Sequence, residues 1–202
     1  MKQPNLSFMK KQFFLSLMAL GLLCSFGAKA QIREFTIGYG IMPQSFNQVE
    51  SINNFVETKF SGSIGPSTTK DFSISGPYRL GFTQYDTKHL TLGADLSYAA
   101  IEAKMTYSDA TKETVNFNYF TLMANVNYQY TDNPKISVYS GVHFGVSYVN
   151  AKNANNSKKG EDYIPAYHLT ALGIRYGEKV GVYADFGYGF NGIVNAGILY
   201  KL

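Results

Sequence analysis

The sequence predicts an all-β fold, an eight-stranded antiparallel up-and-down β-barrel. Apolar side chains recur at every second position in eight segments, which is the period of a strand. Tight and long connections alternate between most of these segments, as in a meander whose two ends meet different environments. The predicted strands span residues 35–41, 78–83, 90–98, 120–130, 136–148, 171–176, 180–190 and 194–202.

The first three segments separate large apolar residues from small and polar ones. The apolar face begins with Phe35 in the first segment and with Tyr78 in the second, and it is rich in leucine in the third. The opposite face carries Thr, Ser and Gly together with Arg79 and Asp95. A helix is excluded, because small and polar residues return at every second place instead of every third or fourth.

The fourth and fifth segments are the longest and most regular. From Phe120 to Tyr130 every second residue is aromatic, Leu, Ala or Val, and from Ile136 to Tyr148 the apolar face is mostly Val and aromatic. The other faces hold Thr, Asn, Ser, Gly and one His. The sixth segment, 171–176, is the least regular of the eight.

The last two segments contain a glycine spacing that imitates a nucleotide-binding turn. Gly187, Gly189 and Gly192 match the pattern G-x-G-x-x-G. That fingerprint needs a strand, a tight turn and then a helix, whereas a second alternating strand follows here. The glycines are therefore interpreted as small residues on the inner face of a strand, and a dinucleotide site is excluded.

Residues 1–30 have the three parts of a cleaved secretory signal peptide. Basic residues stand at the start, an apolar run extends from Phe13 to Gly27, and the small residues Ala28 and Ala30 precede the expected cleavage point. The apolar run is shorter than a membrane-spanning helix requires. The barrel domain is accordingly expected to span residues 31–202.

Removal of the leader changes what the composition allows. The domain keeps fourteen Lys and Arg and fourteen Asp and Glu, so it is formally neutral and its charge does not indicate nucleic acid as a partner. The only cysteine, Cys24, lies in the leader and follows bulky Leu23, whereas a lipoprotein signal has a small residue there. The mature chain therefore has no thiol for a disulfide or a metal, and no cofactor is expected.

The polarity of the two faces predicts a transmembrane barrel. One face carries Val, Ile, Leu, Phe and Tyr over about nine to eleven residues, the length of a tilted membrane-crossing strand. Lipid offers no partner for a free backbone amide, so such a sheet has to close. Tyrosines on this face are expected to form interfacial girdles, with Tyr128, Tyr130, Tyr176 and Tyr200 at the tight-turn end and Tyr98, Tyr148 and Tyr188 at the loop end.

With these features the chain resembles the small eight-stranded outer-membrane β-barrels of Gram-negative bacteria, the OmpA/OmpX-type group. The local match is the stretch GIVNAGILYKL, in which Gly197, Ile198, Tyr200 and Leu202 resemble the assembly signal of that family. The family commonly finishes on Phe, where this chain has Leu202. The resemblance implies a monomer that the barrel-assembly machinery inserts into outer-membrane lipid.

Charged residues on the inward face define the candidate functional residues. Within the strands these are Arg79, Asp95, Arg175 and Asp185, and nearer the tight-turn end they are Glu34 and Lys201. A buried charge needs a partner, so the two arginines are expected to pair with the two aspartates. Such a network is either a plug that holds the shape of a filled interior or a gate on a narrow ion path.

The three histidines do not single out an active site. His89 falls in a tight turn, His143 on the inner face, and His168 near the loop end, where Glu161 or Asp162 is a candidate partner for hydrolytic chemistry. The sequence shows no spacing of ligands typical of a metal site. The interpretation favoured by these residues is that the protein is not an enzyme.

The expected function is that of a non-enzymatic outer-membrane barrel with a structural or surface-interaction role. Its exposed loops, chiefly 43–72 and 150–163, would meet an outside partner that the sequence does not identify. Two alternatives stay open: a small porin-like channel through the Arg/Asp lumen, and a secreted soluble β-barrel that binds a lipophilic ligand. The soluble alternative requires apolar residues such as Phe186 and Ile198 in the centre and the aspartates on the perimeter.

Overall fold

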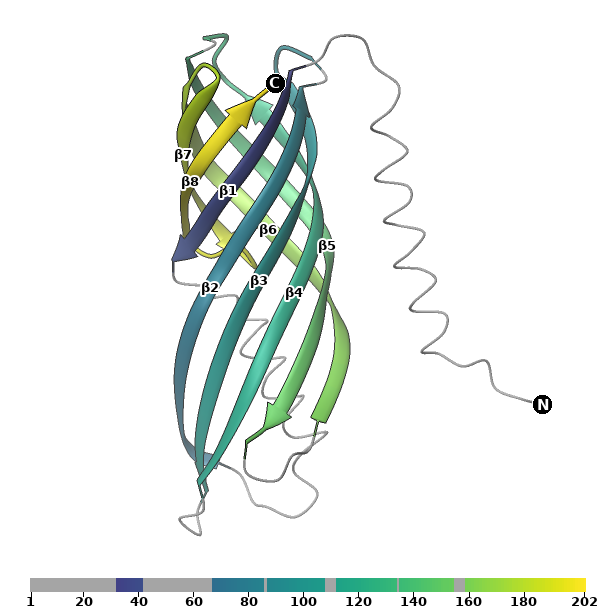
Figure 1. Cartoon of the computed structure of the whole chain (residues 1–202), viewed down its shortest axis with the longest axis vertical. Helices are drawn as coiled ribbons and strands as arrows, with labels where there is room; N and C mark the ends of the chain where they lie inside the picture. The colour runs from purple at the N-terminus through teal and green to yellow at the C-terminus, as the bar shows by residue number, and fades with distance from the viewer. Residues whose placement is uncertain (1–31, 42–66, 86, 108–111, 134, 155–158) are drawn as a thin grey trace, which may run out of the picture.

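The computed structural model describes residues 32–41, 67–85, 87–107, 112–133, 135–154 and 159–202, and these form one closed barrel (Figure 1). The strands are β1 (Arg33–Ile41), β2 (Ser67–Tyr85), β3 (Leu90–Tyr107), β4 (Lys112–Gln129), β5 (Ile136–Asn153), β6 (Lys159–Gly177), β7 (Val180–Gly189) and β8 (Val194–Lys201). Each strand pairs antiparallel with the next, and β8 pairs with β1. The predicted fold class is confirmed, and so is the architecture that the resemblance to the OmpA/OmpX-type barrels implies. The described residues contain no helix long and apolar enough to cross a membrane.

One end of the barrel carries the short connections from β2 to β3, β4 to β5 and β6 to β7, as well as the start of β1 and the end of β8 (Figure 1). Side-chain oxygens fix two of these turns: the Leu90 amide donates to Thr87 Oγ1 at 3.0 Å, and the Lys135 amide donates to Asn133 Oδ1 at 2.8 Å. Polar turn residues thus replace the missing backbone partners. The predicted signal peptide, 1–30, lies outside the described residues.

Next to this turn end, large apolar side chains point outward and polar ones point inward. Val142, Phe186 and Ile198 are 40%, 56% and 61% exposed, whereas Asp95 and Asp185 are 1% and 3% exposed. We call this part of the wall the apolar band; it comprises β1, β7, β8 and the parts of β2 to β6 nearest the turn end. Its distribution is the reverse of the one that a soluble ligand-binding barrel requires.

Five strands are longer than the sequence predicts. β2 to β6 contain 18 or 19 residues each, whereas β1, β7 and β8 contain 9, 10 and 8. The loops expected at 43–72 and 150–163 are corrected accordingly: β2 begins at Ser67, β5 continues to Asn153, and β6 begins at Lys159. The rest of the first expected loop, up to residue 66, lies outside the described residues. We call the parts of these five strands that lie farthest from the turn end the extension; they are 67–75, 99–107, 112–119, 149–153 and 159–162.

In the extension the two faces exchange character. Small and apolar side chains now point inward and form a buried cluster of Ala99, Ile101, Ala103, Val115, Phe117, Tyr119, Val149 and Ala151. The pairing register brings them together, since Phe117 lies opposite Ile101 on one side and Ala151 on the other. The outward positions of the same strands carry Glu102, Lys104, Asn116, Asn118, Asn150 and Lys152. This is the distribution of a sheet with water on its outer face.

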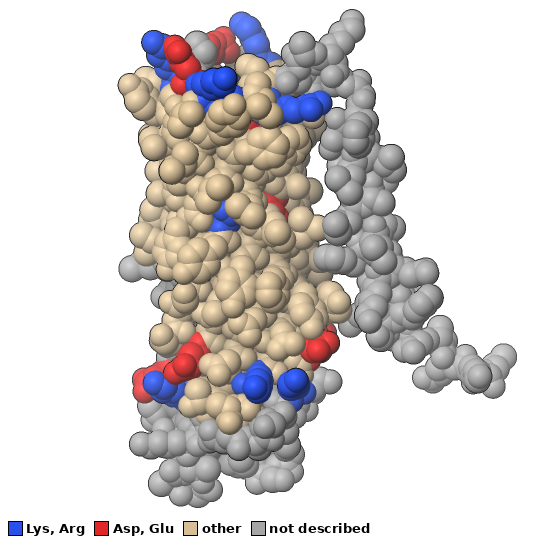
Figure 2. All heavy atoms as spheres, in the orientation of Figure 1, with Lys and Arg blue, Asp and Glu red and all other residues tan. Residues whose placement is uncertain are grey.

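A row of aromatic residues marks the change. Tyr98, Phe120, Tyr148 and Tyr163 are register partners in neighbouring strands, with ring centroids 4.9, 6.5 and 5.2 Å apart along the row. Aromatic side chains with a polar tip favour the boundary between an apolar and an aqueous phase. Figure 2 shows the matching pattern of charge, with Lys, Arg, Asp and Glu gathered in two belts on either side of a broad surface that is almost free of charge.

The irregularity of the sixth segment has a local cause. β6 contains one residue more than β7 between Thr170 and Leu172, and one more than β5 between Thr170 and Gly173. Ala171 therefore forms a β-bulge that shifts the inside-outside alternation. The Ala171 carbonyl accepts a hydrogen bond from the Ser140 hydroxyl at 2.6 Å, and the Tyr130 hydroxyl donates to Ser140 at 3.0 Å. A backbone group that the bulge removes from the ladder is therefore paired on the outer wall.

Candidate functional site

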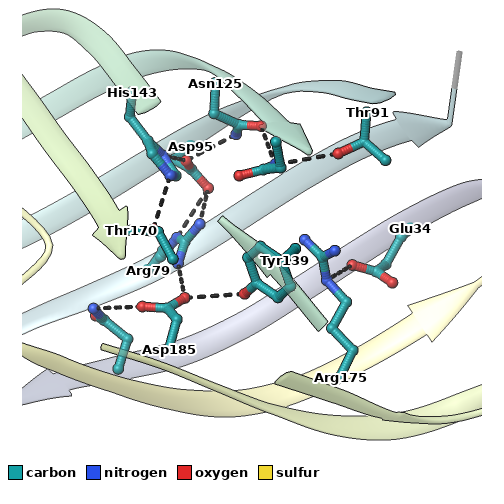
Figure 3. Close-up of polar contacts among 12 residues, drawn as sticks. Glu34, Arg79, Thr91, Asp95, Asn125, Tyr139, His143, Thr170, Arg175 and Asp185 are labelled. Carbon is teal, nitrogen blue, oxygen red and sulfur yellow. Dashed lines mark hydrogen bonds and ion pairs between the residues drawn. The ribbon is translucent and has the colours of Figure 1, made fainter. Parts of the chain in front are cut away.

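The candidate site is the polar lumen of the apolar band. Its centre is Arg79 of β2, which bridges two carboxylates on different strands (Figure 3). Arg79 Nε and Nη2 lie 2.9 and 2.8 Å from Asp95 Oδ1, and Nη1 lies 3.1 Å from Asp185 Oδ2. One guanidinium thus ties β2 to β3 and, across the lumen, to β7. Such charge-assisted bonds in a buried place are short and strongly directional.

The remaining carboxylate oxygens are also paired. Asp95 Oδ2 accepts from Asn125 Nδ2 at 2.9 Å and lies 2.6 Å from His143 Nδ1. Asp185 accepts from the Tyr139 hydroxyl at 3.2 Å and from Asn195 Nδ2 at 3.0 Å. Because lone pairs left unmatched would be costly in a buried site, this completeness stabilises the network.

Arg175 belongs to a second cluster nearer the turn end. Its Nε lies 3.0 Å from Glu34 Oε1, and its guanidinium carbon lies 3.8 Å from the centre of the Tyr139 ring. Tyr85 donates its hydroxyl to the other oxygen of Glu34 at 3.1 Å. The expectation that Arg175 pairs with an aspartate is therefore wrong. The partner is decided by the stagger of the barrel, which places β1 and β6 side chains at one height.

Two inward tyrosines depend on glycines that face them. A Cβ atom at Gly173 would overlap the Tyr139 ring, and Cβ atoms at Gly38 or Gly197 would overlap Tyr183. Glycine at these places leaves room for aromatic rings to cross the lumen. This explains Gly197 of the predicted assembly signal by packing, while Ile198, Tyr200 and Leu202 of that signal are exposed on the outer wall.

The structure brings two of the histidines together. His143 and His168 meet edge to face with ring centroids 5.2 Å apart, and neither ring nitrogen of His168 has a hydrogen-bond partner among the described residues. His89 lies apart at the turn end, 3.1 Å from the Gln129 carbonyl. The suggested partner Asp162 is six residues from His168 on the same strand, about 20 Å at the rise of an extended chain. That pairing is therefore not formed.

Asp95, His143 and Thr170 follow one another in the order of an acid, base and nucleophile. Thr170 Oγ1 lies 3.3 Å from His143 Nε2, opposite the contact of His143 with Asp95. However, the three residues are 0 to 1% exposed, so no substrate atom reaches the hydroxyl. In this arrangement the histidine serves as a brace between strands. Among the described residues no group of three or more His, Cys, Asp or Glu is placed to hold a metal ion.

Comparison with known proteins returns solved structures only. No family model and no curated protein match the chain. The N-terminal β-barrel domain of OprF from Pseudomonas aeruginosa is similar at 12% identity and a TM-score of 0.43, over 87% of this chain and 100% of that one. Ail, the attachment invasion locus protein of Yersinia pestis, is similar in its complex with the heparin analogue sucrose octasulfate, at 13% identity and a TM-score of 0.44, over 86% and 100% of the two chains.

Proposed function

We propose that the mature chain is a non-enzymatic outer-membrane β-barrel that carries its extension on the cell surface, in a structural or surface-interaction role. The observation that supports this is the exchange of inner and outer polarity along single strands. On β3, Leu92 and Leu96 face outward between the turn end and the aromatic row. Glu102 and Lys104 face outward on the other side of the row. The outer wall of the band therefore suits hydrocarbon, and the outer wall of the extension suits water.

The orientation follows from the connections. In outer-membrane barrels the short turns face the periplasm and the longer elements face outside. The turn end of this barrel would therefore be periplasmic, and the extension would project from the outer leaflet. Outer-membrane lipid and, during insertion, the barrel-assembly machinery are the partners that this proposal implies, with the barrel as a monomer.

The filled lumen supports a plug more than a channel. Arg79 spans the interior between Asp95 and Asp185, and each carboxylate has further donors. An eight-stranded barrel has an interior just wide enough for side chains to fill it. A surface role for the extension therefore has more support than conduction through the band.

Single cysteines test this topology, because the expected mature chain contains no cysteine of its own. Intact cells that express Asn118→Cys, Leu122→Cys or Thr87→Cys would be treated with a membrane-impermeant maleimide. We expect labelling of Asn118→Cys on intact cells, of Thr87→Cys only after the outer membrane is permeabilised, and of Leu122→Cys only after denaturation.

Labelling of Leu122→Cys in the native protein would contradict the proposal, and so would recovery of the protein in the soluble fraction. A gel of heated and unheated samples is the control for folding, since a closed barrel in detergent migrates differently from the denatured chain. Asn118 and Leu122 face outward on the same strand, so a difference in their labelling reports only their position along the barrel axis.

A further inference from the structure

The outer wall of the apolar band contains a groove above the β6 bulge. It is an open surface depression with a volume of about 450 Å³. Its lining includes the small residues Ser140 and Ala171, which we call its floor, and the larger residues Val126, Val142 and Leu169, which we call its sides. The groove exists because the bulge places small residues side by side where the neighbouring strands present large ones.

The floor of the groove offers no unsatisfied polar group to a chain lying on it. The Ser140 hydroxyl donates to the Ala171 carbonyl at 2.6 Å and accepts from Tyr130 at 3.0 Å. An apolar occupant therefore covers this hydrogen-bonded pair without breaking any bond to water. Exposure to hydrocarbon along the sides and a neutralised floor are what an acyl chain requires.

Charges of both signs stand where the groove meets the turn end. Leu90 and Tyr128 line this end, and the His89 ring stacks on Tyr128 with centroids 5.8 Å apart. Lys88 Nζ lies 3.5 Å and His89 Nδ1 lies 3.8 Å from the Asp132 carboxylate. These side chains are at least 45% exposed, so they are accessible to a ligand.

We propose that this groove binds one zwitterionic glycerophospholipid of the periplasmic leaflet. One acyl chain would lie over Ser140 and Ala171, the phosphate would contact Lys88 and His89, and the headgroup ammonium would contact Asp132. The pair of opposite charges at the mouth fits a headgroup that itself carries both signs, and basic residues at a membrane surface are typical contacts of lipid phosphate. The inference rests on the proposed membrane insertion.

The test uses the mature barrel extracted in mild detergent, with palmitoyl-oleoyl phosphatidylethanolamine as the probe and native mass spectrometry to count retained lipid. Ala171→Leu fills the groove, and Ala196→Leu makes the same change at an exposed position on β8, away from the groove. Lys88→Glu removes the phosphate contact, and Lys179→Glu changes a lysine in the turn between β6 and β7. We expect Ala171→Leu and Lys88→Glu to weaken binding about tenfold, or about 1.4 kcal/mol, and the two controls to retain it.

Equal retention of lipid by the unsubstituted barrel and the four variants would overturn the proposal. Equal loss of lipid in Ala171→Leu and Ala196→Leu would also overturn it, because it would indicate nonspecific lipid contact around the barrel. Occupation by a second copy would appear as a dimer that Ala171→Leu dissolves, and this would also overturn it. Phosphatidylglycerol as a second probe tests the headgroup: preference for it over phosphatidylethanolamine would contradict the assignment of Asp132. A failure of membrane insertion itself would be read separately from flotation of the same variants with lipid vesicles.

Discussion

The extension prolongs five of the eight strands that form the apolar band, yet the two parts distribute their side chains in opposite ways. Asp95 and Asn125 lie inside the band, whereas Ile101 and Phe117 lie inside the extension on the same two strands. Between β3 and β4 the backbone pairing runs unbroken through both parts, so it does not distinguish them there. The difference is the one expected if the proposed membrane surrounds the band and water surrounds the extension, while the ladder fixes only which side chains face each other.

The largest expected effect comes from breaking the buried charge network of the band. Arg79→Ala leaves Asp95 and Asp185 buried without their cation, and loss of one partner from such a site costs about 3–5 kcal/mol of unfolding free energy. Lys104→Ala breaks the exposed pair with Glu102 in the extension, where about 0–1 kcal/mol is expected. Urea titration of both variants in lipid vesicles, followed by circular dichroism, measures the difference. Equal losses would show that the lumen is hydrated like the outer surface.

A smaller effect is expected when a charge is placed on the outer wall. Ala94 and Ala100 both face outward on β3, on either side of the aromatic row. In the proposed membrane, Ala94→Arg introduces a charge into hydrocarbon and is expected to destabilise the barrel by about 2–4 kcal/mol. Ala100→Arg would face water there and should change stability by less than about 1 kcal/mol. The same unfolding assay compares them. Similar unfolding free energies for the two variants would show that the aromatic row does not mark a boundary between two environments.

The smallest effect concerns the bulge. Ser140→Ala leaves the Ala171 carbonyl on the outer wall without its donor, and the proposed membrane offers no replacement, which should cost about 1–3 kcal/mol. Ser73→Ala, at an exposed place in the extension, should cost a few tenths at most because water replaces the hydroxyl. Unfolding free energies of the two variants check this contrast. A neutral Ser140→Ala would mean that the carbonyl finds another donor.

The number, order and pairing of the strands could be predicted from alternation, because in the band every second residue is apolar. The alternation of the extension has the opposite sense, because polar residues such as Glu102, Lys104 and Asn116 face outward there. A search that counts only outward apolar residues as strand therefore does not find it. The inward series Ala99, Ile101 and Ala103 is the signal that could have found it. The bulge at Ala171 broke the period of the sixth segment and shortened its predicted length.

The members of the lumen network could be predicted better than their partners. Arg79, Asp95 and Asp185 meet, as expected for residues that all face inward. Arg175 instead pairs with Glu34. The position of a side chain along the barrel axis depends on the stagger between strands, which the alternation of residues does not reveal. The hydrogen-bonding roles of Asn125 and Asn195 also depend on that stagger. The sequence identifies both residues only as small polar members of an inner face.

The seam between β1 and β8 has a consequence for how the barrel assembles. Glu34 lies opposite Lys201 and Ile41 opposite Val194, so this junction joins the two ends of the domain, whereas the others link strands consecutive in sequence. Contacts of such long sequence separation form slowly, although the entropy of closing a longer loop rises only by about 0.6 kcal/mol per doubling. Pairing between consecutive strands from β2 to β7 is therefore expected to form first. The sheet would stay open, with one edge of β1 unpaired, until β8 pairs with β1.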